Sequence, residues 1–269
     1  MKACVLGLGE IGLPTALYIK KKRFETWGYD IKEAAVVRAK KNGISATTNW
    51  DEIPPADIYV VTVSTLLKGG FADLTPVFNV CEKIANKRKP SSLISIESTV
   101  IPGTCRKIYE KIFKKKAYLI HIPHRYWAGD PENYGVKQLR VIGGINVESL
   151  EKGQDIFEKQ LKIPLFAVSP IEIAEMSKIT ENAYRYVQIA FAEELKQMCH
   201  ELGLSFEDVR KACNTKWNIE ILEAREGIGG HCLPKDIRYL ASLTPHNVLL
   251  RSAIIVDHKY RQWLKKKIK

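Results

Sequence analysis

Residues 2–22, KACVLGLGEIGLPTALYIKKK, decide the fold predicted for this chain. The apolar run at 2–6 has the composition of a short buried strand. Three glycines follow at 7–12 in a GxGxxG pattern, and the segment at 13–22 has the periodicity of a helix. Glycines placed between a strand and a helix are typical of a turn that binds the phosphates of a dinucleotide.

Each glycine of this turn has its own physical role. Gly7 permits the tight turn, Gly9 lets a pyrophosphate approach the backbone, and Gly12 lets the helix pack close to the strand. Glu10 and Ile11 lie beside the helix N-terminus, where unpaired N–H groups face the phosphates, and they complete the predicted cofactor-binding turn.

Asp30 ends a second predicted strand, FETWGYD (24–30), 18 residues past Gly12. A carboxylate at this place accepts hydrogen bonds from the ribose hydroxyls of adenosine. It would repel a 2′-phosphate, so the sequence favours NAD over NADP. The alternative is an α/β turn that binds no nucleotide.

Strands and helices alternate as far as residue 169. Further strands are predicted at 57–64, 92–98, 117–123, 139–144 and 163–169, and helices at about 74–87, 103–115 and 148–161. This alternation predicts an α/β fold with a doubly wound parallel sheet of the Rossmann type. Ligands bind at the carboxyl ends of such strands, so one rim is expected to carry Gly7–Gly12, Ser64-Thr65, Ser98-Thr99 and His124-Arg125. Thr65 is accordingly a predicted cofactor contact.

The second half of the chain reads as helical. The segment at 170–203 has helical periodicity and ends at Gly203, Ser205 has the pattern of an N-cap, and no strand is predicted after residue 169. We therefore expect a nucleotide-binding domain at 1–169 and an all-helical domain at 170–269.

Four polar residues fall on one face of the long predicted helix: Glu175, Lys178, Asn182 and Arg185. Lys178 and Asn182 lie one turn apart, so they can direct two donors at one developing negative oxygen. The alternative is a solvated polar stripe.

The six cysteines, at positions 4, 81, 105, 199, 213 and 232, show no CxxC spacing and no pairing with histidines. They are expected to be free thiols in a reducing compartment, and no metal site is predicted. Cys232, between a glycine run and Pro-Lys-Asp, is by itself compatible with a buried apolar residue, half of a disulfide or a nucleophile.

Composition excludes some classes of function. The chain has 269 residues and a net charge of +12, with 45% hydrophobic and 27% charged residues, as in a globular protein. The basic charge has no accompanying nucleic-acid-binding motif, so no nucleic-acid partner is predicted. No segment is long and apolar enough to span a membrane, so we expect no membrane association and a cytoplasmic location.

Four motifs together resemble one family. They are GLGEIGLP (7–14), ESTVIPGT (97–104), EMSKITENAYRYVQIAFAEEL (175–195) and GIGGHCLPKD (227–236). In this order, and over nearly the whole chain, they resemble the UDP-glucose/GDP-mannose dehydrogenase family of nucleotide-sugar dehydrogenases. The GGHC segment is more similar to the subgroup acting on UDP-N-acetylhexosamines.

The resemblance implies an NAD-dependent, twofold oxidation of a nucleotide-sugar C6 alcohol to a uronic acid, in polysaccharide biosynthesis. It implies that Cys232 captures the intermediate aldehyde as a thiohemiacetal, which becomes a thioester that water hydrolyses. It assigns Lys178 and Asn182 to the substrate and its oxyanions, and Asp236 to the proton and water network near the sulfur.

The same resemblance assigns further contacts. Thr99 is expected to contact the nicotinamide side and an ordered water, and Lys235 to reach the cofactor phosphates. Gly229 and Gly230 remove side chains where the sugar approaches the backbone.

The sequence departs from the family pattern in two ways. His124 stands where the family usually has a glutamate, which affects thioester hydrolysis, although a histidine can accept a proton near neutral pH. The family also continues into another α/β domain that holds the nucleotide, which this sequence lacks. Four explanations of this missing domain remain open: a separate chain supplies it, the substrate is smaller, the sequence is a truncation, or turnover is weak. The family further implies a homodimer through the helical domain, with 249–256 in the contact.

Two other functions remain open. A β-hydroxyacid dehydrogenase of the 6-phosphogluconate dehydrogenase type performs one oxidation and needs no cysteine. A catalytically weak NAD-binding remnant or subunit is the non-enzymatic alternative. Cys232 with Asp236 four residues later favours two oxidations over one. The presence of Cys232, Lys178, Asn182 and Asp236 together counts against the remnant.

Overall fold

The structure, a computed structural model, describes residues 1–267 and divides into two compact units. The first comprises Met1–Lys68 and Ala72–Lys178, and the second comprises Gly69–Phe71 and Ile179–Lys269. The change from strands to helices predicted at 169–170 falls between strand β10 (Leu165–Val168) and helix α6 (Ile171–Glu201). The division between the compact units lies farther on, within α6.

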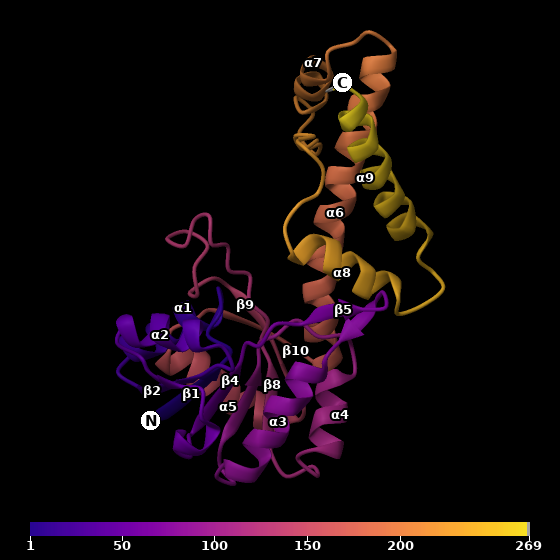
Figure 1. Cartoon of the computed structure of the whole chain (residues 1–269). Helices are drawn as coiled ribbons and strands as arrows, with labels where there is room; N and C mark the ends of the chain where they lie inside the picture. Colours follow the sequence, from indigo (N-terminus) through magenta and orange to yellow (C-terminus); the bar gives the residue numbers. More distant parts are fainter. Residues whose placement is uncertain (268–269) are drawn as a thin grey trace. The chain divides into compact units, whose positions relative to one another are not determined.

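The first unit is built on an eight-stranded sheet with the order β10-β9-β8-β7-β4-β1-β2-β3 (Figure 1). Its other strands are β1 (Lys2–Leu6), β2 (Glu25–Tyr29), β3 (Ser45–Thr47), β4 (Ile58–Val61), β7 (Leu93–Ile96), β8 (Tyr118–His121) and β9 (Arg140–Gly144). Every neighbouring pair is parallel except β8 and β9, which are antiparallel. The segment that joins β8 to β9 contains no helix, and a parallel pair needs such a crossover.

Helices cover both faces of this sheet. They are α1 (Gly12–Lys21), α2 (Glu33–Lys41), α3 (Thr75–Lys87), α4 (Thr104–Lys111) and α5 (Val147–Gln154), with a 3₁₀ turn at Trp50–Glu52 and a π-helical turn at Asp155–Gln160. Along β1, Ala3 and Val5 pack with α1 and α2, whereas Cys4 and Leu6 pack with α3 and α4. Alternate residues of one strand therefore serve two cores, and the predicted doubly wound α/β fold is confirmed.

One hairpin was not predicted from the sequence. Strands β5 (Leu66–Lys68) and β6 (Phe71–Asp73) form a separate two-stranded sheet. The two residues between them, Gly69 and Gly70, have φ of +59° and +85°. Glycine adopts these left-handed conformations without strain, and two such residues are typical of a tight hairpin turn.

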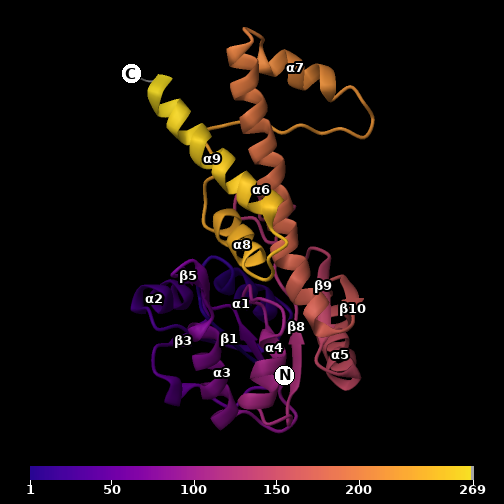
Figure 2. The same cartoon turned by 90° about the vertical axis from the view of Figure 1, so that its right-hand side faces the viewer.

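The second unit is helical. Besides most of α6 it contains α7 (Phe206–Cys213), α8 (Cys232–Ala241) and α9 (Val248–Lys267), and α9 runs beside α6 in both views (Figure 2). Its core joins residues of α6, α8, α9 and the segment before α8: Ala183, Tyr186, Ala190, Ile228, Ile237 and Ala253. Gly203, with φ of +67°, follows α6, and the Ser205 side chain accepts from Asp208 N at the start of α7, as predicted.

The helical unit buries one acid without a hydrogen bond. Glu193, on α6, is fully buried, and neither carboxyl oxygen has a hydrogen-bond partner among the residues that the structure describes. Burial, reinforced by the negative charge of Asp257 and opposed by Arg261, raises the pKa of Glu193 to about 8. Glu193 therefore enters the folded core in its protonated form at neutral pH.

This raised pKa predicts how Glu193 affects stability. The unfolded chain releases the proton near pH 4.5 and the folded chain near pH 8, so stability falls as the pH rises through this interval and is level above it. Glu193→Gln has no titrating group at this position, so its stability should not fall over this pH interval on account of residue 193. At pH 8.5 the parent must take up a proton or bury a charge at Glu193 when it folds, whereas the amide is neutral at every pH. We therefore expect the unfolding free energy of Glu193→Gln at pH 8.5 to exceed that of the parent by a few kcal/mol, at about 1.4 kcal/mol for each unit of pKa shift.

Urea unfolding at pH 5 and at pH 8.5 measures the effect, which should shrink at the lower pH. Glu194→Gln, at the exposed neighbouring position, is the matched control. An advantage of Glu193→Gln that is equal at both pH values would contradict this account.

Candidate active site

The glycine turn has the shape that the sequence predicts. Gly7 has φ of +94°, and a Cβ there would lie 2.8 Å from Thr62 O and from Val63 N. A Cβ on Gly12 would lie 1.7 Å from Gly7 O, so helix α1 can begin this close to β1 only with glycine. At Gly9 the added Cβ has no heavy atom of the described residues within 4 Å other than those of its chain neighbours, which leaves open space beside the backbone.

This turn fits the phosphates of a dinucleotide. Gly9 and Glu10 are exposed, and the N-cap residue of α1, Ile11, makes no side-chain capping bond. The first N–H groups of a helix carry partial positive charge and need acceptors. Gly9, Glu10, Ile11 and Gly12 therefore present an accessible backbone surface suited to an anion, and NAD carries such a group in its pyrophosphate.

Asp30 lies at the carboxyl end of β2 and is tied to the glycine turn. Its Oδ2 accepts a hydrogen bond from Leu8 N at 2.6 Å, and its Oδ1 accepts from Lys32 N at 2.8 Å. Both oxygens keep lone pairs for ribose hydroxyls, because an ionised carboxylate accepts about four bonds. Arg38, which sequence analysis did not single out, donates to Leu8 O at 2.9 Å.

The carboxyl ends of β1, β4, β7 and β8 lie at one edge, because these strands are parallel neighbours. Thr65 Oγ1 donates to Thr99 O at 2.9 Å, and Ser98 Oγ donates to Val63 O at 2.7 Å. The predicted rim residues that follow β4 and β7 are thus brought together.

His124 lies in a buried charged cluster at this edge. Its Nε2 contacts Glu97 Oε2, and Thr15 Oγ1 of helix α1 lies 3.2 Å from the same ring nitrogen. Glu97 Oε2 also accepts from Arg140 Nη2 at 2.7 Å. Sequence analysis missed Glu97, Arg140 and Thr15, although Glu97 opens the ESTVIPGT motif.

The charge states in this cluster follow from Arg140. Burial is the largest single influence on the pKa of Glu97 and raises it, yet the charge of Arg140 and the hydrogen bonds from His124 and Arg140 together lower that pKa to about 2. Burial, together with Arg140, lowers the pKa of His124 to about 4. At neutral pH a neutral His124 therefore donates Nε2–H to an ionised Glu97. The sequence-based expectation of a histidine that gains a proton near neutral pH is not met.

The polar stripe on α6 is divided by the fold. Glu175 is buried, and its two oxygens accept from Gly103 N and Cys105 N, at 2.6 and 2.7 Å, at the start of α4. This carboxylate therefore stabilises the N-terminus of α4. Arg185 is exposed. Lys178 is half-buried, and its charge contributes to the lowered pKa of His124.

Cys232 is the first residue of α8 and is exposed. One turn on, Asp236 is buried and accepts from Asn182 Nδ2 of α6 at 2.5 Å. The buried Lys235 contacts the other oxygen of Asp236 at 2.5 Å and lies over the Tyr239 ring. The structure thus brings Asn182, Lys235 and Asp236 together beside the turn that carries the thiol.

The loop before Cys232 is open at its last two glycines. Apart from the adjoining residues of the chain, no heavy atom of residues 1–267 lies within 4 Å of a Cβ added at Gly229 or Gly230, and Gly230 has φ of +78°. The structure therefore leaves room for a ligand to approach the backbone here. The predicted ligand contacts of Lys235 and of these glycines remain predictions.

Two predicted absences concern metals and membranes. Among residues 1–267 no group of three or more histidine, cysteine or acidic side chains is arranged to hold a metal ion. None of the helices in that part of the chain is long and apolar enough to cross a bilayer.

Comparison with known proteins points to one family. Residues 34–161 match the NAD binding domain of the UDP-glucose/GDP-mannose dehydrogenase family, and residues 172–255 match the central domain of the same family. Together the two matches cover most of the chain.

Individual relatives agree with these matches. The chain is 32% identical to a UDP-N-acetyl-D-mannosamine dehydrogenase of Methanococcus maripaludis, over 94% of this chain and 64% of the relative. It is 31% identical to the Methanocaldococcus jannaschii protein of the same name, over 100% and 68%. The solved structure of a UDP-D-ManNAc dehydrogenase from Pyrococcus horikoshii superposes with a TM-score of 0.88 at 27% identity, over 97% and 69%. The chain spans about two thirds of the length of these relatives.

Asp30 is expected to govern cofactor affinity. Asp30→Ala removes an acceptor for the ribose hydroxyls and the bond to Leu8 N, so the Kd for NAD should rise at least about tenfold. Fluorescence titration with NAD measures it, with Glu25→Ala, at an exposed position of the same strand, as the control. A Kd within about twofold of the parent would remove Asp30 from the cofactor site.

The buried His124 contact is expected to show in stability. Gln at this position can keep an N–H donor for Glu97, whereas Ala leaves the buried carboxylate with one partner fewer, so Ala should cost about 1–3 kcal/mol at pH 7 and Gln much less. The pKa of His124 is lowered from 6.5 to about 4, so its contribution is complete above pH 6.5 and declines as the pH falls towards 4.

The parent should therefore lose more stability than His124→Gln between pH 7 and pH 4.5, as measured by urea unfolding. Equal losses in the two proteins would show that His124 is not held neutral in the fold.

Proposed function

Because the chain belongs to the UDP-glucose/GDP-mannose dehydrogenase family, we propose that it oxidises the C6 alcohol of a nucleotide sugar twice, to the uronic acid. The relatives named UDP-N-acetyl-D-mannosamine dehydrogenase support a UDP-N-acetylhexosamine as the substrate. One observation carries the proposal: an exposed Cys232 begins helix α8, and its first turn is held to α6 through Asp236 and Asn182.

NAD is the cofactor of this family, and the match to the NAD binding domain confirms that prediction. In our proposal the glycine turn at 7–12 holds the pyrophosphate, and Asp30 holds the adenosine ribose. Thr65 and Thr99 face the nicotinamide half from the ends of β4 and β7, and Lys235 contributes to the phosphates. When bound there, NAD accepts the hydride removed from the substrate carbon in each oxidation.

Cys232 provides the chemistry of the second oxidation. Its thiolate adds to the aldehyde carbon, a C–S bond forms, and the carbonyl oxygen takes a proton to give a thiohemiacetal. Loss of that proton and of a hydride gives a thioester. Water then adds to the carbonyl carbon, the C–S bond breaks, and the carboxylate and the thiol are released. A helix N-terminus favours negative charge on the sulfur.

The other proposed residues serve this carbon centre. Lys178 and Asn182 stabilise the negative oxygen that develops in each addition. Asp236 takes part in proton and water exchange near the sulfur, and Gly229 and Gly230 leave room for the sugar. His124 is neutral at neutral pH, so we assign it hydrogen bonding to the attacking water rather than storage of a proton.

We also propose a homodimer formed through the helical unit. Val248, Leu249 and Ile255 of α9 expose large apolar side chains, at 78%, 66% and 54%. Apolar area of this kind is typical of a surface that another chain covers. The nucleotide moiety requires further contacts, which we propose are supplied by the part of the family fold that this sequence does not match.

The products of the reaction test the function. We expect two NADH and one uronate for each UDP-N-acetylhexosamine consumed, measured by absorbance at 340 nm and by chromatography of the sugar. Cys232→Ser should form no uronate, because an alkoxide adduct cannot pass through a thioester. Cys213→Ser, at the other exposed cysteine, is the control and should retain the parent rate.

The assay is run with the chain alone and with the part of the M. maripaludis relative that this chain does not match added in trans. One NADH per substrate would support the single-oxidation alternative. Uronate formed by Cys232→Ser at the parent rate would refute the covalent mechanism. NAD binding without turnover of any UDP-sugar under either condition would support a non-catalytic role.

A further inference from the structure

Asp257 of α9 connects to the loop that precedes Cys232. Its Oδ1 accepts a hydrogen bond from Ile228 N at 2.8 Å, and Ile228 lies four residues before the cysteine. The Ile228 side chain is buried against Ala183 and Tyr186 of α6. The backbone and the side chain of one loop residue are therefore both fixed in the helical core.

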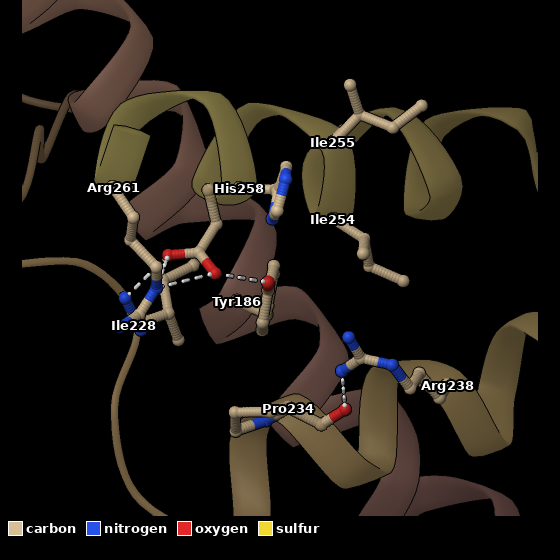
Figure 3. A pocket seen from close by; sticks show the side chains of 9 residues that line it. Tyr186, Ile228, Pro234, Arg238, Ile254, Ile255, His258 and Arg261 are labelled. Atoms are coloured by element: carbon tan, nitrogen blue, oxygen red, sulfur yellow. Dashed lines mark hydrogen bonds and ion pairs between the residues drawn. The ribbon is translucent and has the colours of Figure 1, made fainter. Parts of the chain in front are cut away.

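The carboxylate of Asp257 is held from three sides. Tyr186 Oη, on α6, contacts its Oδ2 at 3.1 Å, and Arg261 Nε, one turn on along α9, lies 3.0 and 3.2 Å from its two oxygens. The dashed lines in Figure 3 join Arg261 and Tyr186 to this group, with Ile228 beside them. Asp257 is buried, so each of these bonds is made in a setting where water does not compete.

The loop also packs on Arg261. Gly227 has φ of +95°, and a Cβ there would lie 2.7 Å from Arg261 Cζ. The loop can therefore take this path over the guanidinium only with glycine at this position. Arg261 therefore does two things: its guanidinium orients Asp257, and its side chain supports the loop at Gly227.

Cys232 is thus bracketed by two anchored points. Ile228 on its N-terminal side is bonded to Asp257, and Asp236 on its C-terminal side is bonded to Asn182. Between Ile228 and Cys232 lie Gly229 and Gly230, which have open space in place of side-chain contacts. Because glycines hold the backbone only loosely, the position of Cys232 on this side depends on the anchored residue before them, Ile228.

We propose that Asp257 is a positioning residue for Cys232, which acts by anchoring the loop at 227–231 through Ile228 N. The proposal rests on the proposed function for its catalytic consequence, but its structural consequence can be measured without turnover. When the anchor is lost, the thiol leaves its place at the N-terminus of α8 and the negative charge on sulfur loses the stabilisation of the helix.

The test is the alkylation rate of Cys232 by iodoacetamide at pH 7, followed by peptide mass in a Cys213→Ser background, since the remaining four cysteines are buried. Asp257→Ala should slow alkylation by about fivefold or more, whereas Asp257→Asn, which keeps an acceptor for Ile228 N, should stay close to the parent. His258→Ala is the control, because Asp257 and the exposed His258 both line a cavity of about 470 Å³ between α6, α8 and α9. It should leave the rate unchanged.

Activity gives the second readout. In Asp257→Ala we expect kcat for uronate to fall by about the same factor as alkylation, with KM for the sugar nearly constant, and Asp257→Asn to restore both. If Asp257→Ala lacks the parent's circular dichroism, Gly227→Ala replaces it, because that variant displaces the loop from Arg261 and keeps the carboxylate. The same slower alkylation is expected.

A folded variant of either kind that alkylates within about twofold of the parent overturns the proposal. Slowed alkylation with rescue by Asn, in a protein that forms no uronate, upholds the positioning and refutes the proposed function. If the parent forms uronate and Asp257→Ala is alkylated as fast as the parent, the proposed function is upheld and the positioning role of Asp257 is refuted.

Discussion

The hydrogen bond between Asn182 and Asp236 is the contact on which the candidate chemistry depends. It joins the long helix α6 to the first turn of α8, at 2.5 Å, and so fixes the helix that begins with Cys232. Asp236 is buried and also contacts Lys235, so its charge is compensated where solvent is absent. A cysteine elsewhere on this surface would be an ordinary thiol, whereas here it has a defined helix terminus behind it and a defined carboxylate one turn away.

Buried charge also organises the sheet unit. Arg140, on β9, keeps Glu97 ionised at the end of β7, and Glu97 in turn orients His124 after β8. This chain of contacts explains how a histidine can occupy a buried position without a positive charge. Its role is that of a fixed hydrogen-bonding group, and a proton carrier at neutral pH would need a different environment.

The sequence predicted what depends on local pattern. GxGxxG between a strand and a helix, and alternating apolar segments, were sufficient for the doubly wound sheet, and Ser205 and Gly203 marked helix ends correctly. The antiparallel step at β9 was not predicted, because strand direction depends on the connection and not on strand composition. The Gly69-Gly70 hairpin did carry a local signal that was overlooked. Partners distant in the sequence, such as Glu97 with Arg140 or Ile228 with Asp257, arise only from tertiary packing.

Trapping the intermediate on Cys232 is the sharpest test of the proposed covalent step. The protein is mixed with NAD and a UDP-N-acetylhexosamine, quenched in acid at successive times, and digested for peptide mass analysis. We expect an acyl adduct on the peptide that contains Cys232, which appears with NADH and disappears as uronate is released. Uronate that accumulates while the Cys232 peptide stays unmodified at every time point would contradict it.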